Sequence, residues 1–196
     1  MRLRQSLALA AAVVLPVALA GCAAAPVPLP SPPATAGPTT APNPGATPTT
    51  VPVPPEEDAI PVAIGCADLV DADTMYRFNP NFSLLGDWTP EAGTFAAADV
   101  QAGGTACRWV NQTSGDPIDV SVSAFGEAGL TELKNAAFAE FEMVPTYGEE
   151  AYFGTDGDAG VAIAFQGSYR LVATSPWFLE PGEPEEIILG ALAALP

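Results

Sequence analysis

The chain has 196 residues, enough for one domain of ordinary size together with terminal appendages. It carries 6 Lys+Arg against 23 Asp+Glu, a net charge of -17, and it has no histidine. The charge argues against nucleic acids as partners, because their binding needs Lys and Arg to neutralise phosphates. The lack of histidine removes the commonest general base and the commonest metal ligand.

An export signal opens the chain. Arg2 and Arg4 give it a positive start, and residues 7–20 form an apolar stretch too short to span a bilayer comfortably. Leu19-Ala20-Gly21-Cys22 follows and resembles the lipobox of bacterial lipoproteins at all four positions. The resemblance implies that residues 1–21 are removed and that the Cys22 sulfur is diacylated. Two or more acyl chains give stable anchoring, so we expect the protein on the extracytoplasmic face of the cell membrane. A plain secretory signal followed by a chance cysteine is the alternative.

A spacer follows the lipidated cysteine. Residues 22–57 are mostly Pro, Ala and Thr, with no aromatic residue and no charge before Glu56. Such a composition buries too little apolar surface to offset the entropy of ordering, which predicts a disordered linker biased to polyproline II. Its expected role is to hold the domain away from the membrane; a ligand for a proline-binding domain is the sharper alternative.

Residues 58–196 carry nearly all the aromatic residues, which predicts one extracytoplasmic domain. Once Cys22 is assigned to lipid, Cys66 and Cys107 remain in an oxidising compartment, and we expect them to form a disulfide. A redox or nucleophilic pair is the alternative, although only Arg108 supplies positive charge beside it.

The first half of the domain begins with a helix over about 67–78, in two pieces, with Asp71 capping the second piece and Pro80 ending it. A loop containing Phe82 and Trp88 should follow, and then a possible short strand near Phe95. Residues 106–111 are predicted to form a strand, which turns at 114–116 into an alternating strand over 118–124.

The second half also begins with a helix. We predict a helix over about 127–141, a short strand at 151–153, a hairpin with strands at 161–165 and 169–173, and a terminal helix that opens near Pro184. The order of elements favours an α+β domain: an antiparallel sheet with helices packed on one face, and one disulfide.

Three short segments resemble actinobacterial lipoproteins of the DUF3558 type. They are Cys66-Ala67-Asp68-Leu69-Val70-Asp71, Gly103-Gly104-Thr105-Ala106-Cys107-Arg108-Trp109, and Tyr147-Gly148-Glu149-Glu150-Ala151-Tyr152. The resemblance covers most of 64–196 and implies a paired-cysteine α+β domain with no catalytic residues to carry over. A looser similarity links the pattern to the PsbP-like sandwich of other actinobacterial lipoproteins.

Catalytic and metal-binding chemistry finds little support. Asp156-Gly157-Asp158 resembles the start of a calcium loop, but the position of its bidentate glutamate is Gly167, so we expect a turn and no metal site. Paired carboxylates could hydrolyse glycans, and the obvious candidates are Glu140, Glu142, Glu149 and Glu150, although a solvated acidic surface is the simpler interpretation. We predict no catalytic residue and no cofactor.

The segment Trp177-Phe178-Leu179 is the candidate contact, because it lies in a predicted loop between the last strand and the last helix. The alternative is that these residues cover the core or the sheet edge. We therefore expect a membrane-anchored, non-catalytic binding or interaction module with a protein or cell-wall partner. A cell-wall glycan hydrolase and a carrier of a small apolar ligand remain as alternatives.

Lipidation can be tested by replacing Cys22. Without the acceptor sulfur, Cys22→Ala should block processing, so that no protein of mature size reaches the membrane fraction. Fractionation and immunoblotting of cells that express each form would measure this. A mature-size Cys22→Ala protein retained in the membrane would contradict the prediction.

Overall fold

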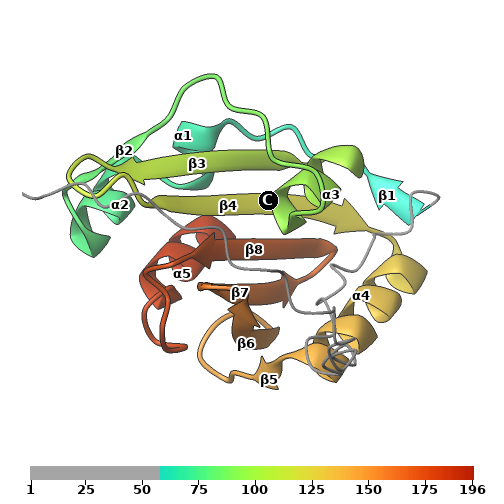
Figure 1. The fold of residues 1–196 in the computed structure, drawn as a ribbon. Coiled ribbons are helices and arrows are strands. Elements are labelled where there is room, and N and C mark those ends of the chain that lie inside the picture. Colours follow the sequence, from blue (N-terminus) through green and yellow to red (C-terminus); the bar gives the residue numbers. More distant parts are fainter. Residues whose placement is uncertain (1–57) are drawn as a thin grey trace, which may run out of the picture. The chain divides into compact units, whose positions relative to one another are not determined.

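An antiparallel sheet of eight strands forms the centre of the computed structural model, which describes residues 58–196 (Figure 1). The expectations for the signal segment, Cys22 and the linker fall on residues 1–57, outside the described residues. The strands are β1 (Ala59–Ile60), β2 (Phe82–Leu84), β3 (Thr105–Asn111), β4 (Pro117–Phe125), β5 (Glu142–Met143), β6 (Glu150–Asp156), β7 (Ala159–Gln166) and β8 (Tyr169–Ser175).

The sheet order is β2-β3-β4-β8-β7-β6-β5, and β1 pairs with β4 outside this path. Both predicted hairpins are present. Gly115, with φ 83°, lies in the connection between β3 and β4, where a left-handed backbone suits glycine. The hairpin of β7 and β8 pairs Gln166 with Tyr169 across a two-residue turn that contains Gly167.

Five helices complete the domain, and local sequence explains where two of them begin. They are α1 (Cys66–Leu69), α2 (Ala72–Phe78), α3 (Phe95–Gln101), α4 (Glu127–Glu140) and α5 (Glu185–Ala193). The side chain of Asp71 accepts a hydrogen bond of 2.6 Å from the Thr74 N–H, which confirms the predicted cap of α2. The helix C-terminal to Pro184 is also present.

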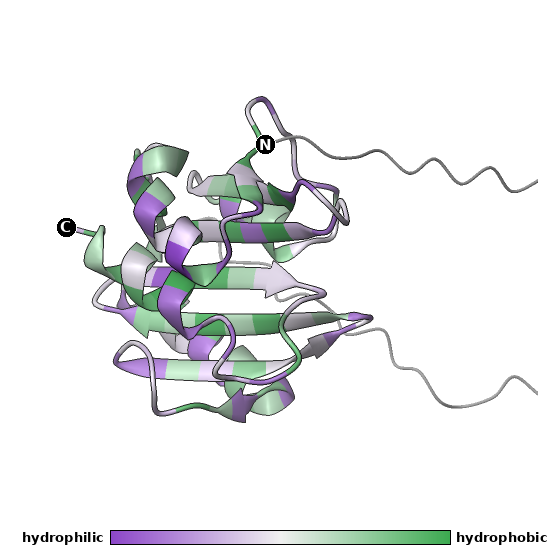
Figure 2. Cartoon of the chain, turned by 90° about the vertical axis from the view of Figure 1, so that its left-hand side faces the viewer, coloured by the Kyte–Doolittle hydropathy of each residue, from purple (hydrophilic) through white to green (hydrophobic). Residues whose placement is uncertain are grey.

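The α+β class and the antiparallel sheet are confirmed, but the helices cover both faces of the sheet rather than one. Val120 belongs to a core with Met75 of α2 and Ile188 of α5. A second core contains Phe95 of α3 and Leu133 of α4. The reason is visible in β7, whose residues from Gly160 to Phe165 are all buried. A continuous run of small and apolar residues is typical of a strand covered on both sides. Figure 2 shows hydrophobic stretches along the central strands.

Two local expectations were wrong. The segment near Phe95 forms helix α3 instead of a strand, because the Thr94 hydroxyl accepts the N–H of Ala97 at 3.2 Å and three alanines with high helix propensity follow Phe95. Phe82 lies in strand β2, where it pairs with Asn111, rather than in a loop.

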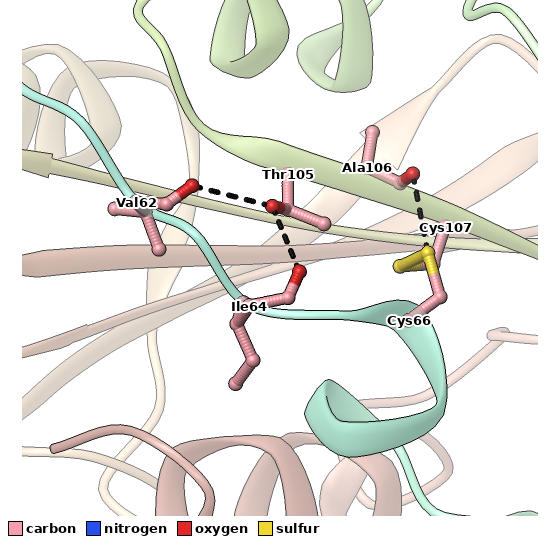
Figure 3. Close-up of a disulfide and its surroundings, with 6 residues drawn as sticks. All are labelled: Val62, Ile64, Cys66, Thr105, Ala106 and Cys107. Carbon is pink, nitrogen blue, oxygen red and sulfur yellow. Dashed lines mark hydrogen bonds between the residues drawn. A yellow bond between two sulfur atoms is a disulfide. The ribbon is translucent and has the colours of Figure 1, made fainter.

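A disulfide between Cys66 and Cys107 joins α1 to β3, as the sequence predicts, with the two Cα atoms 5.5 Å apart (Figure 3). The Thr105 hydroxyl lies beside it and donates to the carbonyl oxygen of Ile64 at 3.1 Å. The segment before α1 is therefore fixed to the sheet by a covalent bond and a hydrogen bond. In the chain-entropy model, closing a loop of this length stabilises the fold by about 4 kcal/mol.

An ion pair is buried between α3 and the sheet. Asp99 is 0% exposed and Arg170 is 2% exposed. A terminal guanidinium nitrogen of Arg170 lies 2.5 Å from Asp99 Oδ1. The Ser121 hydroxyl donates to Asp99 Oδ2 at 2.5 Å, and the Ser123 hydroxyl donates to Oδ1. Because burying a charge is costly unless it is paired and hydrogen-bonded, these contacts account for a charge at this depth.

Asp99→Asn keeps the shape of the side chain but leaves the Arg170 charge buried without a counter-ion. We expect the free energy of unfolding to fall by about 3–5 kcal/mol, measured by urea denaturation followed by tryptophan fluorescence. The matched control is Asp119→Asn, which breaks the more exposed pair with Arg108 and should cost about 1 kcal/mol. An Asp99→Asn loss no larger than that of Asp119→Asn would contradict the prediction.

Candidate interaction surface

The loop between β8 and α5 separates its three apolar residues by exposure. Trp177 is 37% exposed and Leu179 is 74% exposed, whereas Phe178 is 0% exposed. The sequence placed all three in one contact. The structure instead makes Phe178 a core residue, and leaves Trp177 and Leu179 as the candidates that stay available to a partner.

A cluster of aromatic rings lies beneath this loop. The Phe178 ring packs edge-on against Phe78 of α2 with centroids 6.2 Å apart, and Phe78 lies 5.8 Å from Phe82 of β2. Trp177 packs edge-on against Phe82 at 5.6 Å. Its indole Nε1 donates to Asp116 Oδ2 at 3.1 Å. Both loop residues, Trp177 and Phe178, therefore pack against aromatic rings of β2 and α2. Trp177 is fixed in position although it is partly exposed.

Hydrogen bonds to the Glu183 side chain fix the backbone of the next residues of the loop. The Glu183 carboxylate oxygen Oε2 accepts the N–H of Leu179, and it accepts the N–H of Glu180 at 2.9 Å. One side chain thus satisfies two backbone donors in a segment with two prolines. These contacts fix the backbone of Leu179, while its side chain remains largely exposed.

A groove of about 550 Å³ lies beside the loop, between α2 and α5. We call it the α2–α5 groove, and it is lined by Arg77, Gly182, Glu185, Glu186, Leu189 and Gly190. Gly190 allows the two helices to approach closely, because a Cβ there would lie 2.7 Å from the Thr74 methyl group. Arg77 Nε is 2.6 Å from Glu186 Oε1 across the groove. Gly182 belongs to the same loop as Leu179, so this loop forms part of the groove wall.

A second groove, of about 400 Å³, lies between α2 and β2 and is more apolar. Its lining includes Tyr76, Phe82, Leu84 and Trp109. The indole Nε1 of Trp109 is buried and has no hydrogen-bond partner among the described residues. Sequence reasoning missed both grooves. The first joins α2 to α5, which lie more than 100 residues apart, and the second depends on Trp109 of β3 packing beside the neighbouring elements α2 and β2.

The acidic residues considered for catalysis have varied surroundings. Glu140, Glu142 and Glu149 are exposed. Glu150 accepts a hydrogen bond from the Tyr152 hydroxyl at 2.5 Å and pairs with Lys134 at 3.0 Å. These contacts, with the tyrosine bond the largest, lower the pKa of Glu150. Burial, followed by the same bond, raises the pKa of Tyr152 to about 12. A general acid needs the opposite shift in its carboxyl group.

The segment that resembles a calcium loop forms a turn. Gly157, with φ 60°, joins β6 to β7, and Asp156 pairs with Ala159 across this hairpin. Within residues 58–196, no group of three or more Cys, Asp or Glu side chains is placed to hold a metal ion. In the same range, no helix is long and apolar enough to cross a membrane.

Comparison with family models, with curated proteins and with solved structures finds no match for this chain.

The loop can be tested by three alanine substitutions with graded burial. Phe178→Ala should cost about 3–5 kcal/mol in the free energy of unfolding, as expected for a buried aromatic ring. Trp177→Ala loses one ring contact and one hydrogen bond, and should cost about 2 kcal/mol. Leu179→Ala should change stability by no more than about 0.5 kcal/mol. Chemical denaturation measures all three. A Trp177→Ala loss equal to that of Phe178→Ala would remove Trp177 from the surface.

Proposed function

We propose that this protein is an extracytoplasmic lipoprotein of the DUF3558-like type, anchored in the cell membrane by acylated Cys22, whose domain is a non-catalytic interaction module. The lipobox-like segment and the proline-rich stretch supply the anchor and the spacer. The observation that carries the proposal is the loop containing Trp177 and Leu179, which exposes apolar side chains next to a groove.

The loop is suited to binding because its shape exists before a partner arrives. Trp177 is held by Phe82 and Asp116, and the backbone at Leu179 is held by Glu183. Ordering side chains at an interface normally costs about 0.5–1.5 kcal/mol for each flexible residue. A loop fixed in advance avoids much of this cost, and aromatic residues in such a position are frequent binding hot spots.

Glycan hydrolysis by paired carboxylates is less well supported. Of the four glutamates considered, Glu150 has the most defined surroundings, and its partners Lys134 and Tyr152 stabilise its ionised form. The proposed role for these residues is therefore a solvated, partly paired surface.

A carrier of a small apolar ligand is the second candidate, and the groove between α2 and β2 favours it. About 400 Å³ falls within the usual size of small-molecule sites, and aromatic residues line much of it. Quenching of tryptophan fluorescence by a long-chain fatty acid would measure such binding. Quenching that Tyr76→Ala leaves unchanged would count against this groove as the site.

Site-specific photo-crosslinking in intact cells tests the interaction module. A benzophenone side chain at position 179 should give a discrete adduct with a partner, because Leu179 is 74% exposed in the loop whose Gly182 lines the groove. The matched control is position 138 on α4, where Phe138 is 67% exposed. We expect no adduct, or a different one, from position 138. The same adducts from both positions, or none from position 179, would contradict the proposal.

A further inference from the structure

We infer that the α2–α5 groove receives a positively charged segment of a partner protein, one that carries a Lys or Arg beside an apolar residue. The inference rests on the proposed interaction module and names the chemistry of its partner. It depends on three observations. Every basic side chain of the domain is already paired, acidic side chains line the groove, and exposed apolar residues lie in the groove and in the adjoining loop.

Each Lys and Arg in residues 58–196 already has an acidic partner. Arg77 pairs with Glu186, Arg108 with Asp119, Lys134 with Glu150, and Arg170 with Asp99. This range contains 21 of the 23 acids, since Glu56 and Glu57 precede it, so 21 - 4 = 17 acids lack a basic partner in the domain. The domain therefore keeps a strongly negative surface, and electrostatic complementarity favours a cationic partner over an anionic one.

Four acids, three of them without a basic partner, lie in seven consecutive residues that border or line the groove. They are Glu180, Glu183, Glu185 and Glu186, and the exposed residues Leu179 and Leu189 flank them. Apolar and acidic groups thus occur together here, which distinguishes this region from an evenly solvated acidic surface. Leu189 is 44% exposed and lines the groove itself.

Glu185 is the free carboxylate of the groove. Glu186 is occupied by Arg77, and Glu183 accepts two backbone N–H groups. The Glu185 carboxylate forms no ion pair within the described residues, although it lines the groove. It precedes Leu189 by four residues on α5, so the two side chains are neighbours on one helix face. A partner segment could therefore pair its Lys or Arg with the Glu185 carboxylate and pack its apolar side chain against Leu189.

The charge also decides between possible occupants. A second copy of this chain would bring another strongly acidic surface, and nucleic acids or anionic lipids would bring negative phosphates. Each is repelled over a distance set by the Debye length. A basic segment is attracted over the same distance, and its apolar residues find Leu179 and Leu189 exposed.

The test uses the complete mature chain, residues 22–196, produced without acyl chains. The probe is a ten-residue synthetic peptide of alternating lysine and leucine, and the control peptide alternates glutamate and leucine. Calorimetric titration should detect binding of the lysine peptide only. Its affinity should fall as ionic strength rises from 0.01 to 0.15 M, where the Debye length shortens from about 30 to about 8 Å.

Paired variants locate the binding. Glu185→Gln with Leu189→Ser should weaken the lysine peptide by about tenfold or more. The matched control, Glu132→Gln with Phe138→Ser, removes one exposed acid and one exposed apolar residue from α4 and should change affinity less than about twofold. The single variant Glu185→Lys reverses the charge at this half-buried position and should also abolish binding. Circular dichroism that matches the unmodified chain shows that the variant is folded.

Two results would overturn the inference. Equal weakening by both variant pairs would show general attraction to an acidic surface, and a lysine peptide that fails to bind would exclude this partner chemistry. Either result leaves the interaction module itself to be judged separately, by the crosslink from position 179. Loss of that crosslink together with normal peptide binding would reject the proposed function and keep the chemistry of the groove.

Discussion

The buried pair of Asp99 and Arg170 is the interaction on which the arrangement of the domain depends. Asp99 comes from α3, Arg170 from β8, and the two serines that complete the site come from β4. One carboxylate therefore connects a helix to two central strands. Gly104, just after α3, permits this closeness, because a Cβ there would lie 2.1 Å from the Val122 carbonyl oxygen. With α3 held on the sheet, Phe95 reaches the second core and packs near Phe141, with ring centroids 6.2 Å apart.

Because helices cover both faces of the sheet, the proposed interaction surface lies at the ends of the elements. The interior positions of β4, β7 and β8 are occupied by packed side chains, so the sheet offers no open face at its centre. The exposed apolar residues next to a groove instead lie where α2, the β8–α5 loop and α5 meet. This region is supported by a rigid frame, since the disulfide holds α1 on β3 and the aromatic cluster joins α2, β2 and the loop.

In the proposed interaction, charge would give this surface its selectivity. The four basic residues of the domain are all paired with acids of the same domain, and the pair of Arg170 and Asp99 is fully buried. Internal pairing leaves the remaining acids to act together as a negative field, which attracts cations and repels phosphates. The exposed leucines add apolar area at one place in that field. Attraction at long range and packing at short range therefore favour the same site.

Several features could be predicted from the sequence because they depend on local patterns or on simple counting. Three cysteines with one assigned to lipid predicted the pairing of Cys66 with Cys107, the Asp71 cap predicted where α2 begins, and alternation predicted the hairpin of β7 and β8. Other features required the tertiary structure, because they depend on which distant residues meet. Nothing near Asp99 in sequence indicates that it faces Arg170, 71 residues away. The segment Trp177-Phe178-Leu179 has three apolar side chains in a row, and only its packing against Phe78 and Phe82 decides that Phe178 is buried while its neighbours remain exposed.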